Sequence, residues 1–392
     1  MNAEGDRRRI ARPRLYHTKS RTGCIRCRGR RVKCNEARPV CNNCHRHSVS
    51  CYYDREPNPV VAARPRQSQS RAPSPALRDD LHAAVGYWEL RAFHHFAVAT
   101  CETLPGSHIP SVKKCWALQV PLLALSYKPL WNQLLALSAL HLVTSGHDQS
   151  ELLACRANYL DATLQSYRPA LGRLSEETAE SACFTSILLL VDTFATLQHR
   201  PLDNYCYEPP MQWLRVTQGA RAVFEASATD TDPTSSIMTI ISSSNHNQGI
   251  TSADRESRQR LYYLLDTFPG ETPPLQGVSQ AYQETVDRLS LILAAWEAGE
   301  PLLALCRRLM SFACLVPCVF LELVEQKVPR ALCILGHFFA VSVCAKDMWW
   351  VGEAPFREVH AIRACLPPEL QHFMDWPYQI IINPSGPPDH KG

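Results

Sequence analysis

The stretch TGCIRCRGRRVKCNEARPVCNNCHRHSVSCYY (residues 22–53) holds six of the 17 cysteines of a 392-residue chain. These six form two copies of one C-x2-C-x6-C unit, joined by six residues: Cys24, Cys27, Cys34, Cys41, Cys44 and Cys51. Two cysteines separated by two residues can hold one soft cation from a single turn, and tetrahedral zinc–thiolate sites use that spacing. The stretch therefore predicts a small metal-stapled module.

The number of thiols indicates how the metal is held. Six thiolates are too many for one tetrahedral zinc and two short of the eight that two separate sites need, so two of them must be shared. We expect a cluster of two zinc ions bridged by the first cysteine of each copy, Cys24 and Cys41. His45 and His47 lie in the second copy, but the ligand set is complete without them, so we expect surface or phosphate-facing residues there.

Three disulfides would use the same six thiols, but disulfides require an oxidising compartment. The first residues, MNAEGDRRRIARPR (1–14), are charged and lack the apolar run of a signal peptide. The longest apolar run, FACLVPCVFL from Phe312, contains Pro317 and is shorter than the roughly 18 residues that predict a membrane span. Zinc is therefore favoured over disulfides, and we expect no membrane partner.

Charge divides the chain into two parts. Residues 1–60 contain 15 Lys and Arg against 5 Asp and Glu, a net charge of +10, whereas residues 61–392 contain 26 against 32, a net charge of −6. A compact basic module is typical of nucleic-acid binding, where phosphate neutralisation supplies most of the non-specific affinity. A solvated basic tail used only for nuclear import would carry the same charge. Four basic residues, however, lie between the second and third cysteines, where metal coordination would fix their geometry, and we expect them to contact DNA: Arg28, Arg30, Arg31 and Lys33.

The same stretch resembles the fungal binuclear zinc-cluster transcription factors in its cysteine spacing, its basic first loop, the proline before the fourth cysteine and the two tyrosines after the last. The resemblance implies two zinc ions, a nuclear location and double-stranded DNA with CGG-like triplets as the partner. It also implies that the basic residue three places before the third cysteine recognises the triplet. That residue is Arg31, where the family usually has lysine, and Asn35 stands where it usually has aspartate.

Arginine can contact guanine O6 and N7 in bidentate fashion, so base recognition is retained at Arg31. Arg28 and Lys33 are the expected phosphate contacts, and we expect no consequence of Asn35 for zinc ligation because all six thiols are present. The competing interpretation is a zinc-stapled module that recruits proteins or cofactors without direct DNA readout. Ring-type modules of that kind use longer loops and usually a ligating histidine, and this spacing has neither.

After Asp54, the segment REPNPVVAARPRQSQSRAPSPALRDD (55–80) is rich in Pro, Arg, Ser and Gln, as linkers are. Many regulators of this kind carry a dimerising coiled coil near this position. Four residues here follow heptad-like steps, Leu77, Leu81, Ala84 and Trp88. Arg91 and His95 then break the pattern, so we expect an ordinary amphipathic helix and leave a homodimer open.

The rest of the chain predicts helices. Apolar residues recur at helical spacing in LLALSALHLV (134–143), ELLACRANYLDATLQSYRPAL (151–171) and SACFTSILLLVDTFATL (181–197), with polar or proline-bearing stretches between them. The expected fold is a small zinc-stapled DNA-binding module followed by an all-α multi-helix regulatory domain. The polar segment 229–260 predicts a long loop. The expected divisions are a basic tail (1–19), the binuclear zinc cluster (20–55), a Pro/Arg/Ser-rich linker (56–76) and the helical domain (77–392).

Successive blocks of the helical domain, such as ELRAFHHFAVATCETL and MQWLRVTQGARAVF, resemble the regulatory domain of sterol uptake control protein-like zinc-cluster factors. The resemblance implies an all-helical, dimerising unit whose apolar pocket near the C-terminus would take an apolar small-molecule effector. Six residues are candidates to line it: Leu332, Leu335, Phe338, Phe339, Trp349 and Trp350. The alternative is that they fill a closed core, the usual role of aromatic residues at helical spacing.

An enzyme is not expected. The chain has no G-x-S-x-G elbow, no phosphate-binding P-loop, no H-E-x-x-H pair and no G-x-G-x-x-G fingerprint. His141 and His337 are candidates for catalysis, but each more plausibly caps a helix or crosses a helix interface. The cysteines beyond residue 100 lie mostly among apolar neighbours, where a thiol behaves as a small hydrophobe. The sequence therefore predicts a nuclear, sequence-specific DNA-binding transcription factor. The resemblance to the zinc-cluster family implies RNA polymerase II genes as targets, with a metabolic or biosynthetic gene cluster as the candidate.

Overall fold

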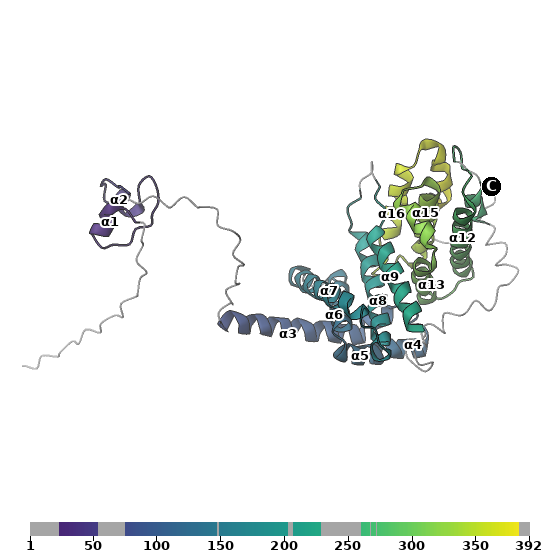
Figure 1. The fold of residues 1–392 in the computed structure, drawn as a ribbon, viewed down its shortest axis with the longest axis horizontal. Helices are drawn as coiled ribbons and strands as arrows, with labels where there is room; N and C mark the ends of the chain where they lie inside the picture. Colours follow the sequence, from purple (N-terminus) through teal and green to yellow (C-terminus); the bar gives the residue numbers. More distant parts are fainter. Residues whose placement is uncertain are drawn as a thin grey trace, which may run out of the picture. The chain divides into compact units, whose positions relative to one another are not determined.

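The computed structural model describes residues 23–53, 75–146, 149–202, 207–228, 260–266, 268–271 and 273–383. The chain divides into two compact units, one within Met1–Pro73 and the other within Ser74–Gly392 (Figure 1). We call the first the cysteine module and the second the helical unit. Helices are the only regular secondary structure in the described ranges, which confirms the predicted fold class. The segment 229–259, predicted to be a loop, and nearly all of the predicted linker lie outside the described residues.

The cysteine module repeats one local structure twice. Each C-x2-C pair opens a short helix, α1 (Ile25–Gly29) or α2 (Asn42–Arg46). The second residue after each helix has a left-handed backbone, with φ 53° at Arg31 and 49° at Ser48. The next residue, a valine in both copies, donates its N–H to the carbonyl of the second cysteine of the pair at 3.0 and 3.1 Å. Both helices thus end in a Schellman motif, and the sequence repeat is also a structural repeat.

In the residues that the structure describes, the helical unit consists of helices and short turns. Its α-helices are α3 (Pro75–Val98), α4 (Pro110–Lys114), α5 (Val120–Ser126), α6 (Lys128–Thr144), α7 (Gln149–Leu171), α8 (Glu176–Ala195), α9 (Met211–Ala228), α12 (Gln276–Glu297), α13 (Leu302–Leu315), α14 (Cys318–Glu325), α15 (Pro329–Ser342), α16 (Ala354–Cys365) and α17 (Asp375–Ile382). Its short turns of other types are η1 (Thr100–Thr103), η2 (Cys115–Gln119), η3 (Thr196–Gln198), η4 (Tyr262–Leu265), η5 (Val343–Ala345) and η6 (Pro368–Met374).

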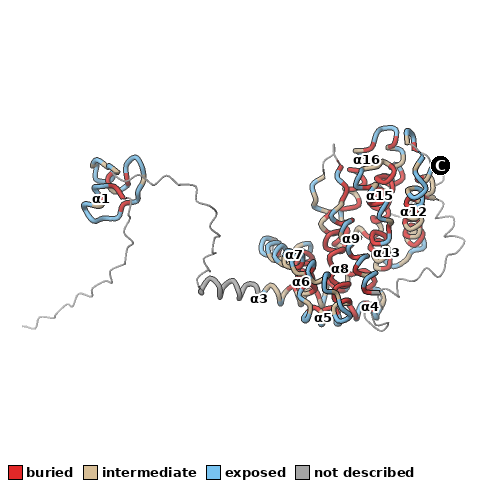
Figure 2. The backbone as a smooth tube through the Cα atoms, in the orientation of Figure 1, coloured by how far each residue is buried: buried red, intermediate tan, exposed pale blue. Residues whose placement is uncertain are grey.

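Three helices, α6, α8 and α15, lie at the centre of the helical unit. They are buried on nearly all sides, as expected for helices that are apolar all round. α6 packs against α3, α7 and α8, α8 also packs against α9, and α15 packs against α12, α16 and α17. Figure 2 shows buried residues along these central helices and exposed residues on the outer ones. α3 is the helix expected near residue 77, and it turns Ala92 and Phe96 into the core.

One core helix has the composition of a membrane span. The segment Glu176–Gln198, which is α8 with η3, reaches a mean hydropathy of 1.4 over 18 residues, and 83% of that window is buried inside the unit. The pair Leu302–Leu315 and Cys318–Glu325 passes the same test only if counted as one span bent by 84°. Burial among neighbouring helices accounts for the apolar composition of α8, which the sequence analysis had not singled out as a candidate span.

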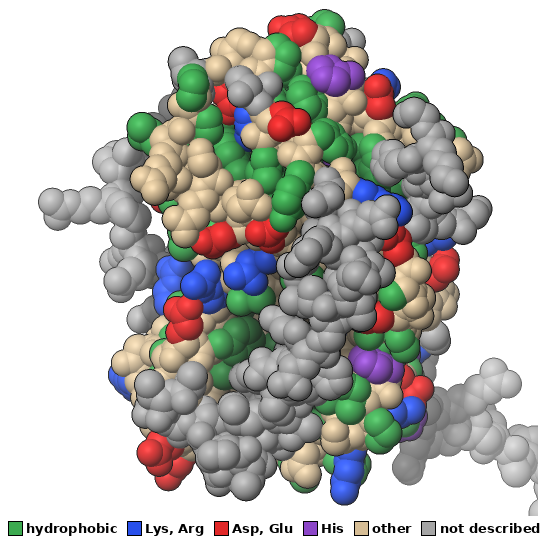
Figure 3. Space-filling model, turned by 90° about the vertical axis from the view of Figure 1, so that its right-hand side faces the viewer, with side chains coloured by type: hydrophobic (Ala, Val, Ile, Leu, Met, Phe, Trp, Pro, Cys, Tyr) green, Lys and Arg blue, Asp and Glu red, His purple; other side chains and the backbone are tan. Residues whose placement is uncertain are grey.

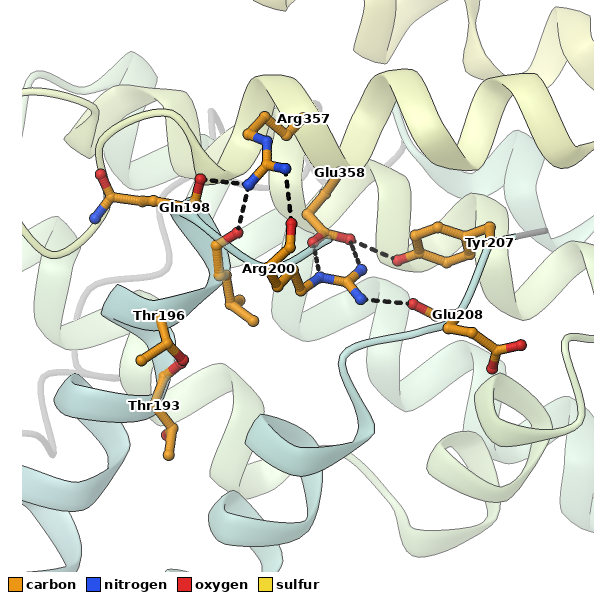
Figure 4. Close-up of polar contacts among 9 residues, drawn as sticks. Thr193, Thr196, Gln198, Arg200, Tyr207, Glu208, Arg357 and Glu358 are labelled. Carbon is orange, nitrogen blue, oxygen red and sulfur yellow. Dashed lines mark hydrogen bonds and ion pairs between the residues drawn. The ribbon is translucent and has the colours of Figure 1, made fainter. Parts of the chain in front are cut away.

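A buried ion pair fastens the segment between α8 and α9 to α16 (Figure 4). The guanidinium of Arg200 donates to both carboxylate oxygens of Glu358, at 2.5 and 2.6 Å. Glu358 is fully buried, and the hydroxyl of Tyr207 also donates to it, at 2.8 Å. Beside this pair, Arg357 donates to backbone carbonyls of the same segment, including that of Arg200 at 2.7 Å. Four side chains therefore connect parts of the chain about 150 residues apart in sequence.

The surface of the helical unit mixes charged and apolar side chains. On the face shown in Figure 3, Lys and Arg side chains lie next to Asp and Glu, and hydrophobic side chains are exposed in small groups between them. Ion pairs at the surface include Arg308–Glu300 at 2.6 Å and Arg221–Glu225 at 2.7 Å. Exposed pairs contribute about 0–1 kcal/mol each, so the buried contacts dominate the stability of the unit.

Candidate metal centre and nucleic-acid interface

The sulfur atoms of the six predicted ligands gather in two overlapping groups of four, with all sulfurs of a group within 4.8 Å of one another. The groups are Cys24, Cys27, Cys34 and Cys41, and Cys24, Cys41, Cys44 and Cys51. Cys24 and Cys41 belong to both groups, which is the sharing that two bridging thiolates require. The sulfur atoms of Cys24 and Cys41 lie 3.7 Å apart, and the sulfur of Cys41 lies 3.6 Å from that of Cys27. Two sulfurs bound to one tetrahedral zinc at about 2.3 Å are about 3.8 Å apart, so the donor set fits zinc.

The alternative of three disulfides does not match this geometry. All six cysteines are free thiols. Their sulfur atoms approach to 3.6–3.7 Å, whereas a disulfide bond requires about 2.05 Å.

The two shared thiols occupy equivalent places in the repeat. Cys24 is the N-cap of α1 and accepts the N–H of Cys27, and Cys41 is the N-cap of α2 and accepts the N–H of Cys44, both at 3.4 Å. Burial raises the pKa of Cys24, Cys27 and Cys44. Burial also opposes ionisation of Cys41, but the Cys44 N–H and neighbouring thiols lower its pKa to about 6. Bound cations are what would hold all six as thiolates.

Two side chains outside the ligand set support the module, and the sequence analysis assigned neither of them a role. The hydroxyl of Tyr53 lies 3.8 Å from the sulfur of Cys34 and donates to the carbonyl of Ala37 at 2.9 Å. The side-chain oxygen of Asn35 accepts the N–H of Asn42, the first residue of α2, at 2.9 Å. Asparagine therefore ties the first copy of the repeat to the helix of the second. The signal available in the sequence was the position of Asn35, a hydrogen-bond acceptor directly after the predicted ligand Cys34.

The four basic residues predicted to contact DNA lie on α1 and the turn that follows it. Arg30, Arg31 and Lys33 are exposed, and Arg28 is half-buried. Arg26, which is not among the predicted contacts, is exposed on the same helix. His45 and His47 in the second copy are both exposed, as expected of surface residues.

Comparison with known proteins adds the family. A profile of the fungal Zn(2)-Cys(6) binuclear cluster domain matches residues 22–59. A Zn(2)-C6 fungal-type transcription factor of Aspergillus fumigatus, afumD, is 38% identical over 346 residues, which cover 85% of this chain and 88% of that protein. The chain belongs to the fungal Zn(2)-C6 transcription factors. As a member, it is a DNA-binding transcription regulator, and its binuclear cluster domain binds two zinc ions.

Other relatives of this Zn(2)-C6 factor differ in how much of it they cover. A Zn(2)-C6 fungal-type transcription factor of Gibberella zeae is 26% identical over 440 residues, covering 94% of this chain and 87% of that protein. Sterol uptake control protein 2 of Candida albicans is 57% identical over 44 residues, which are 11% of this chain and 6% of that protein. The match is too short to include the helical unit, so it supports the sterol uptake resemblance of that unit only loosely.

The six residues predicted to line an effector pocket pack within the core of the helical unit. Trp349 is half-buried, and the other five are at most 3% exposed. Phe338 stacks on Phe312 with ring centroids 4.6 Å apart, and Trp350 meets Phe194 edge-on at 5.8 Å. These contacts are those of the closed core weighed as the alternative. The effector stays a prediction.

The two histidines weighed as catalytic both cross helix interfaces, as the sequence analysis favoured. His337 on α15 lies with Nδ1 2.7 Å from the carbonyl of Cys333 and Nε2 2.5 Å from the hydroxyl of Tyr263. His141 on α6 stacks on Trp349 at 4.5 Å, and its Nδ1 lies 3.0 Å from the hydroxyl of Thr100. Burial lowers the pKa of both histidines to about 4, so both are neutral at pH 7.

Proposed function

We propose that this transcription factor recognises a guanine-containing, CGG-like triplet through Arg31. The observation that carries the proposal is the exposed position of that residue, on the turn that ends α1. Arg31 has φ 53° at the position that ends α1, where helices usually place glycine. A side chain in this left-handed region costs about 1–2 kcal/mol. Ser48 has the same backbone in the second copy, so this turn belongs to the fold of both copies. Only in the first copy does the turn present an exposed guanidinium, and a guanidinium can contact guanine O6 and N7.

The two copies of the repeat differ in their basic residues, and this difference supports DNA contact through the first copy. The first copy carries four basic residues between its second and third cysteines, Arg28, Arg30, Arg31 and Lys33. The equivalent positions of the second copy, 17 residues later, are His45, His47, Ser48 and Ser50. The copies share their fold but differ in charge, so the first copy is the one suited to phosphates. We assign Arg28, Arg30 and Lys33 to the phosphate backbone.

The metal centre completes the proposal. We assign all six cysteines as zinc ligands, with Cys24 and Cys41 bridging, because these two sulfurs belong to both groups of four. When bound, the ions supply the charge that keeps the thiolates together. The cysteines in turn fix α1 and the turn that carries Arg31.

Several broader assignments rest on the same family membership. We place the protein in the nucleus, at RNA polymerase II genes, with a metabolic or biosynthetic gene cluster as target, and we expect no catalytic activity. A homodimer is supported by exposed apolar residues along α3, with Tyr87 58%, Leu90 73% and Val98 55% exposed. The domain divisions at residues 19, 55 and 76 and an apolar effector of the helical unit also remain proposals.

The experiment compares two equivalent substitutions, Arg31→Gly and Ser48→Gly. Each gives the backbone the residue that it favours, and only the first removes the proposed base contact. We expect Arg31→Gly to lose about 1–3 kcal/mol of discrimination between a CGG-like site and a scrambled site, and Ser48→Gly to lose none. Competition binding with the zinc-loaded protein measures both. Equal weakening of both sites by Arg31→Gly would contradict the base contact.

A third variant tests the phosphate contacts. Lys33→Ala should weaken binding to every sequence alike and reduce the salt slope by about 0.9. The non-DNA alternative, a protein-recruiting module, predicts no steep dependence of DNA binding on salt in any variant.

A further inference from the structure

The segment Pro110–Ser126 is one helical run with an irregular turn inside it. α4 leads into η2, a π-helical turn, and η2 into α5. Pro121 accounts for the wide turn, because it has no N–H to donate to the carbonyl of Ala117 and its ring would clash with that carbonyl in a regular helix. The inner side of the run is fixed by burial: Trp116, Val120 and Ala124 are at most 1% exposed.

The outer side of this run is apolar as well. Leu118, Leu122 and Leu125 are 52%, 63% and 65% exposed. Their spacing of four and three residues places them on one side of a helix. Single exposed leucines are ordinary, but a contiguous apolar stripe on a helix marks an interaction site. Figure 2 shows exposed residues along α5 at the edge of the helical unit.

The segment of chain that contains the stripe is basic. Residues 103–147 contain three lysines and no Asp, Glu or Arg. Lys113 forms an ion pair with Glu102 at 2.7 Å. Lys114, one turn before the first leucine, and Lys128, three residues after the last, are exposed and form no ion pair within the described part of the chain. An apolar stripe with an uncompensated positive charge at each end calls for a partner that is apolar in the middle and acidic at its edges.

We propose that this surface, which we call the α5 face (Leu118, Leu122 and Leu125 with Lys114 and Lys128), docks an acidic amphipathic helix of another protein. Helices in grooves and on helix faces present apolar residues at the same four- and three-residue steps. A second copy of the chain fits less well. A two-fold interface sets a surface against itself, so lysines would meet lysines with no acidic residue of 103–147 between them. The inference goes beyond the proposed DNA recognition and does not depend on it.

The test uses the full-length, zinc-loaded protein and a designed peptide of about 16 residues, roughly four helical turns, with leucines on one face and glutamates on the other. A twin peptide carries lysine in place of each glutamate. Fluorescence anisotropy should show binding of the acidic peptide and at least about tenfold weaker binding of the twin. Equal affinities for the two peptides would overturn the charge argument.

Variants of the protein locate the site. Leu122→Asp should weaken binding of the acidic peptide by at least about tenfold, and Lys114→Glu with Lys128→Glu by about threefold or more. Leu153→Asp, on α7 at a leucine 45% exposed, is the matched control and should change nothing. Unchanged thermal unfolding excludes misfolding, and Leu122→Ala repeats the test with a milder change. Peptide binding insensitive to position 122 would refute the proposal.

Two further measurements separate this partner from the other occupants of an apolar face. Sedimentation of the wild type that shows self-association lost in Leu122→Asp would assign the face to a second copy and overturn the proposal. Binding of anionic vesicles that depends on Leu122, without binding of the acidic peptide, would assign it to a lipid surface and overturn it equally. An unchanged mass and no vesicle binding, together with peptide binding, support a protein partner.

Discussion

Buried cysteines occur in both units of this molecule and have opposite roles in them. In the cysteine module, Cys24 and Cys41 are fully buried, and each lies within 4 Å of other thiols. In the helical unit, Cys183, Cys306 and Cys333 are also fully buried, but they lie in an apolar core. Exposure is therefore the same in the two sets, and what differs is that, among the described residues, thiols gather in groups of four only in the module. Density and spacing of thiols, rather than burial, distinguish ligands from core residues.

The two units are also stable for different reasons. The core of the cysteine module consists of its cysteines, with Val49 and Tyr53 packed against them. So small a chain rarely buries enough apolar surface to fold alone, and metal binding replaces the missing core. The helical unit has the large apolar core of an ordinary domain. Substitutions of the same kind should therefore differ greatly in cost between the units.

The largest difference is expected for Cys41→Ala. Because Cys41 belongs to both groups of four thiols, we expect the variant to lose both zinc ions and the fold of the module. Structural zinc contributes on the order of 10 kcal/mol to a small domain. Elemental analysis and the amide spectrum of residues 23–53 measure the two effects. A variant that keeps one zinc and a folded module would show that Cys41 does not bridge.

The next effect belongs to the helical unit and should spare the module. Glu358→Ala leaves the Arg200 guanidinium without its buried partner, and breaking such a pair costs about 3–5 kcal/mol. All eight tryptophans lie in residues 88–376, so tryptophan fluorescence during urea unfolding reports on this unit alone. Zinc content should stay unchanged.

The control for Glu358→Ala is Glu325→Ala, which breaks the exposed ion pair with Arg215. An exposed pair contributes at most about 1 kcal/mol. Equal losses in the two variants would mean that the buried pair contributes no more than a surface pair, and that the core alone fixes the segment between α8 and α9.

The third prediction concerns pH and again separates the units. His337 is neutral when folded, with its pKa lowered to about 4 by burial, whereas an unfolded histidine has a pKa of about 6.5. Between these values the unfolded chain binds more protons, so stability is present above pH 6.5 and falls as the pH drops toward 4. The loss per histidine is roughly 3 kcal/mol. Urea unfolding followed by tryptophan fluorescence at pH 7 and 4.5 should show it.

His337→Gln supplies the reference for this pH effect, since glutamine does not titrate. The variant should be less stable at pH 7, because it disturbs the contacts with Tyr263 and Cys333, but its stability should change less with pH. An identical pH dependence in wild type and variant would contradict the role of His337. The zinc module loses its metal on acidification for another reason, protonation of thiolates, which elemental analysis follows separately.

Features that depend on residues close together in the sequence could be predicted, and features that depend on residues far apart could not. The gathering of the six cysteines was predictable because it is local: all six lie within residues 24–51, and their number and spacing imply shared thiols. The helices were predictable from apolar periodicity. The contact between Arg200 and Glu358 was not, because the two residues are 158 positions apart and nothing in either segment indicates the other. The π turn Cys115–Gln119, which precedes Pro121 in the run that carries the α5 face, was not predicted either.

Individual residues show the same limit. Asn35 was judged only for zinc ligation, but its side chain binds the start of α2, a contact between the two copies that appears only once they are packed together. The left-handed backbone of Arg31 could not be expected from an arginine, because the pattern of residues there lacks the usual glycine. Long-range pairing is set by tertiary packing, which a single sequence does not contain, and the left-handed turn is set by the Schellman motif, which the residue types at 30–32 do not indicate.

The smallest expected effect is the counterpart of the first, the same substitution at a core cysteine. Cys333→Ala removes a fully buried thiol whose pKa burial raises to about 12, so it is a neutral, apolar group and no ligand. The loss of a few contacts should cost about 1–2 kcal/mol in urea unfolding, with zinc content unchanged. Cys318→Ala, at an exposed thiol on α14, should cost less than about 0.5 kcal/mol. A loss of zinc in Cys333→Ala would contradict the comparison, because it would make a core cysteine of the helical unit part of the metal centre.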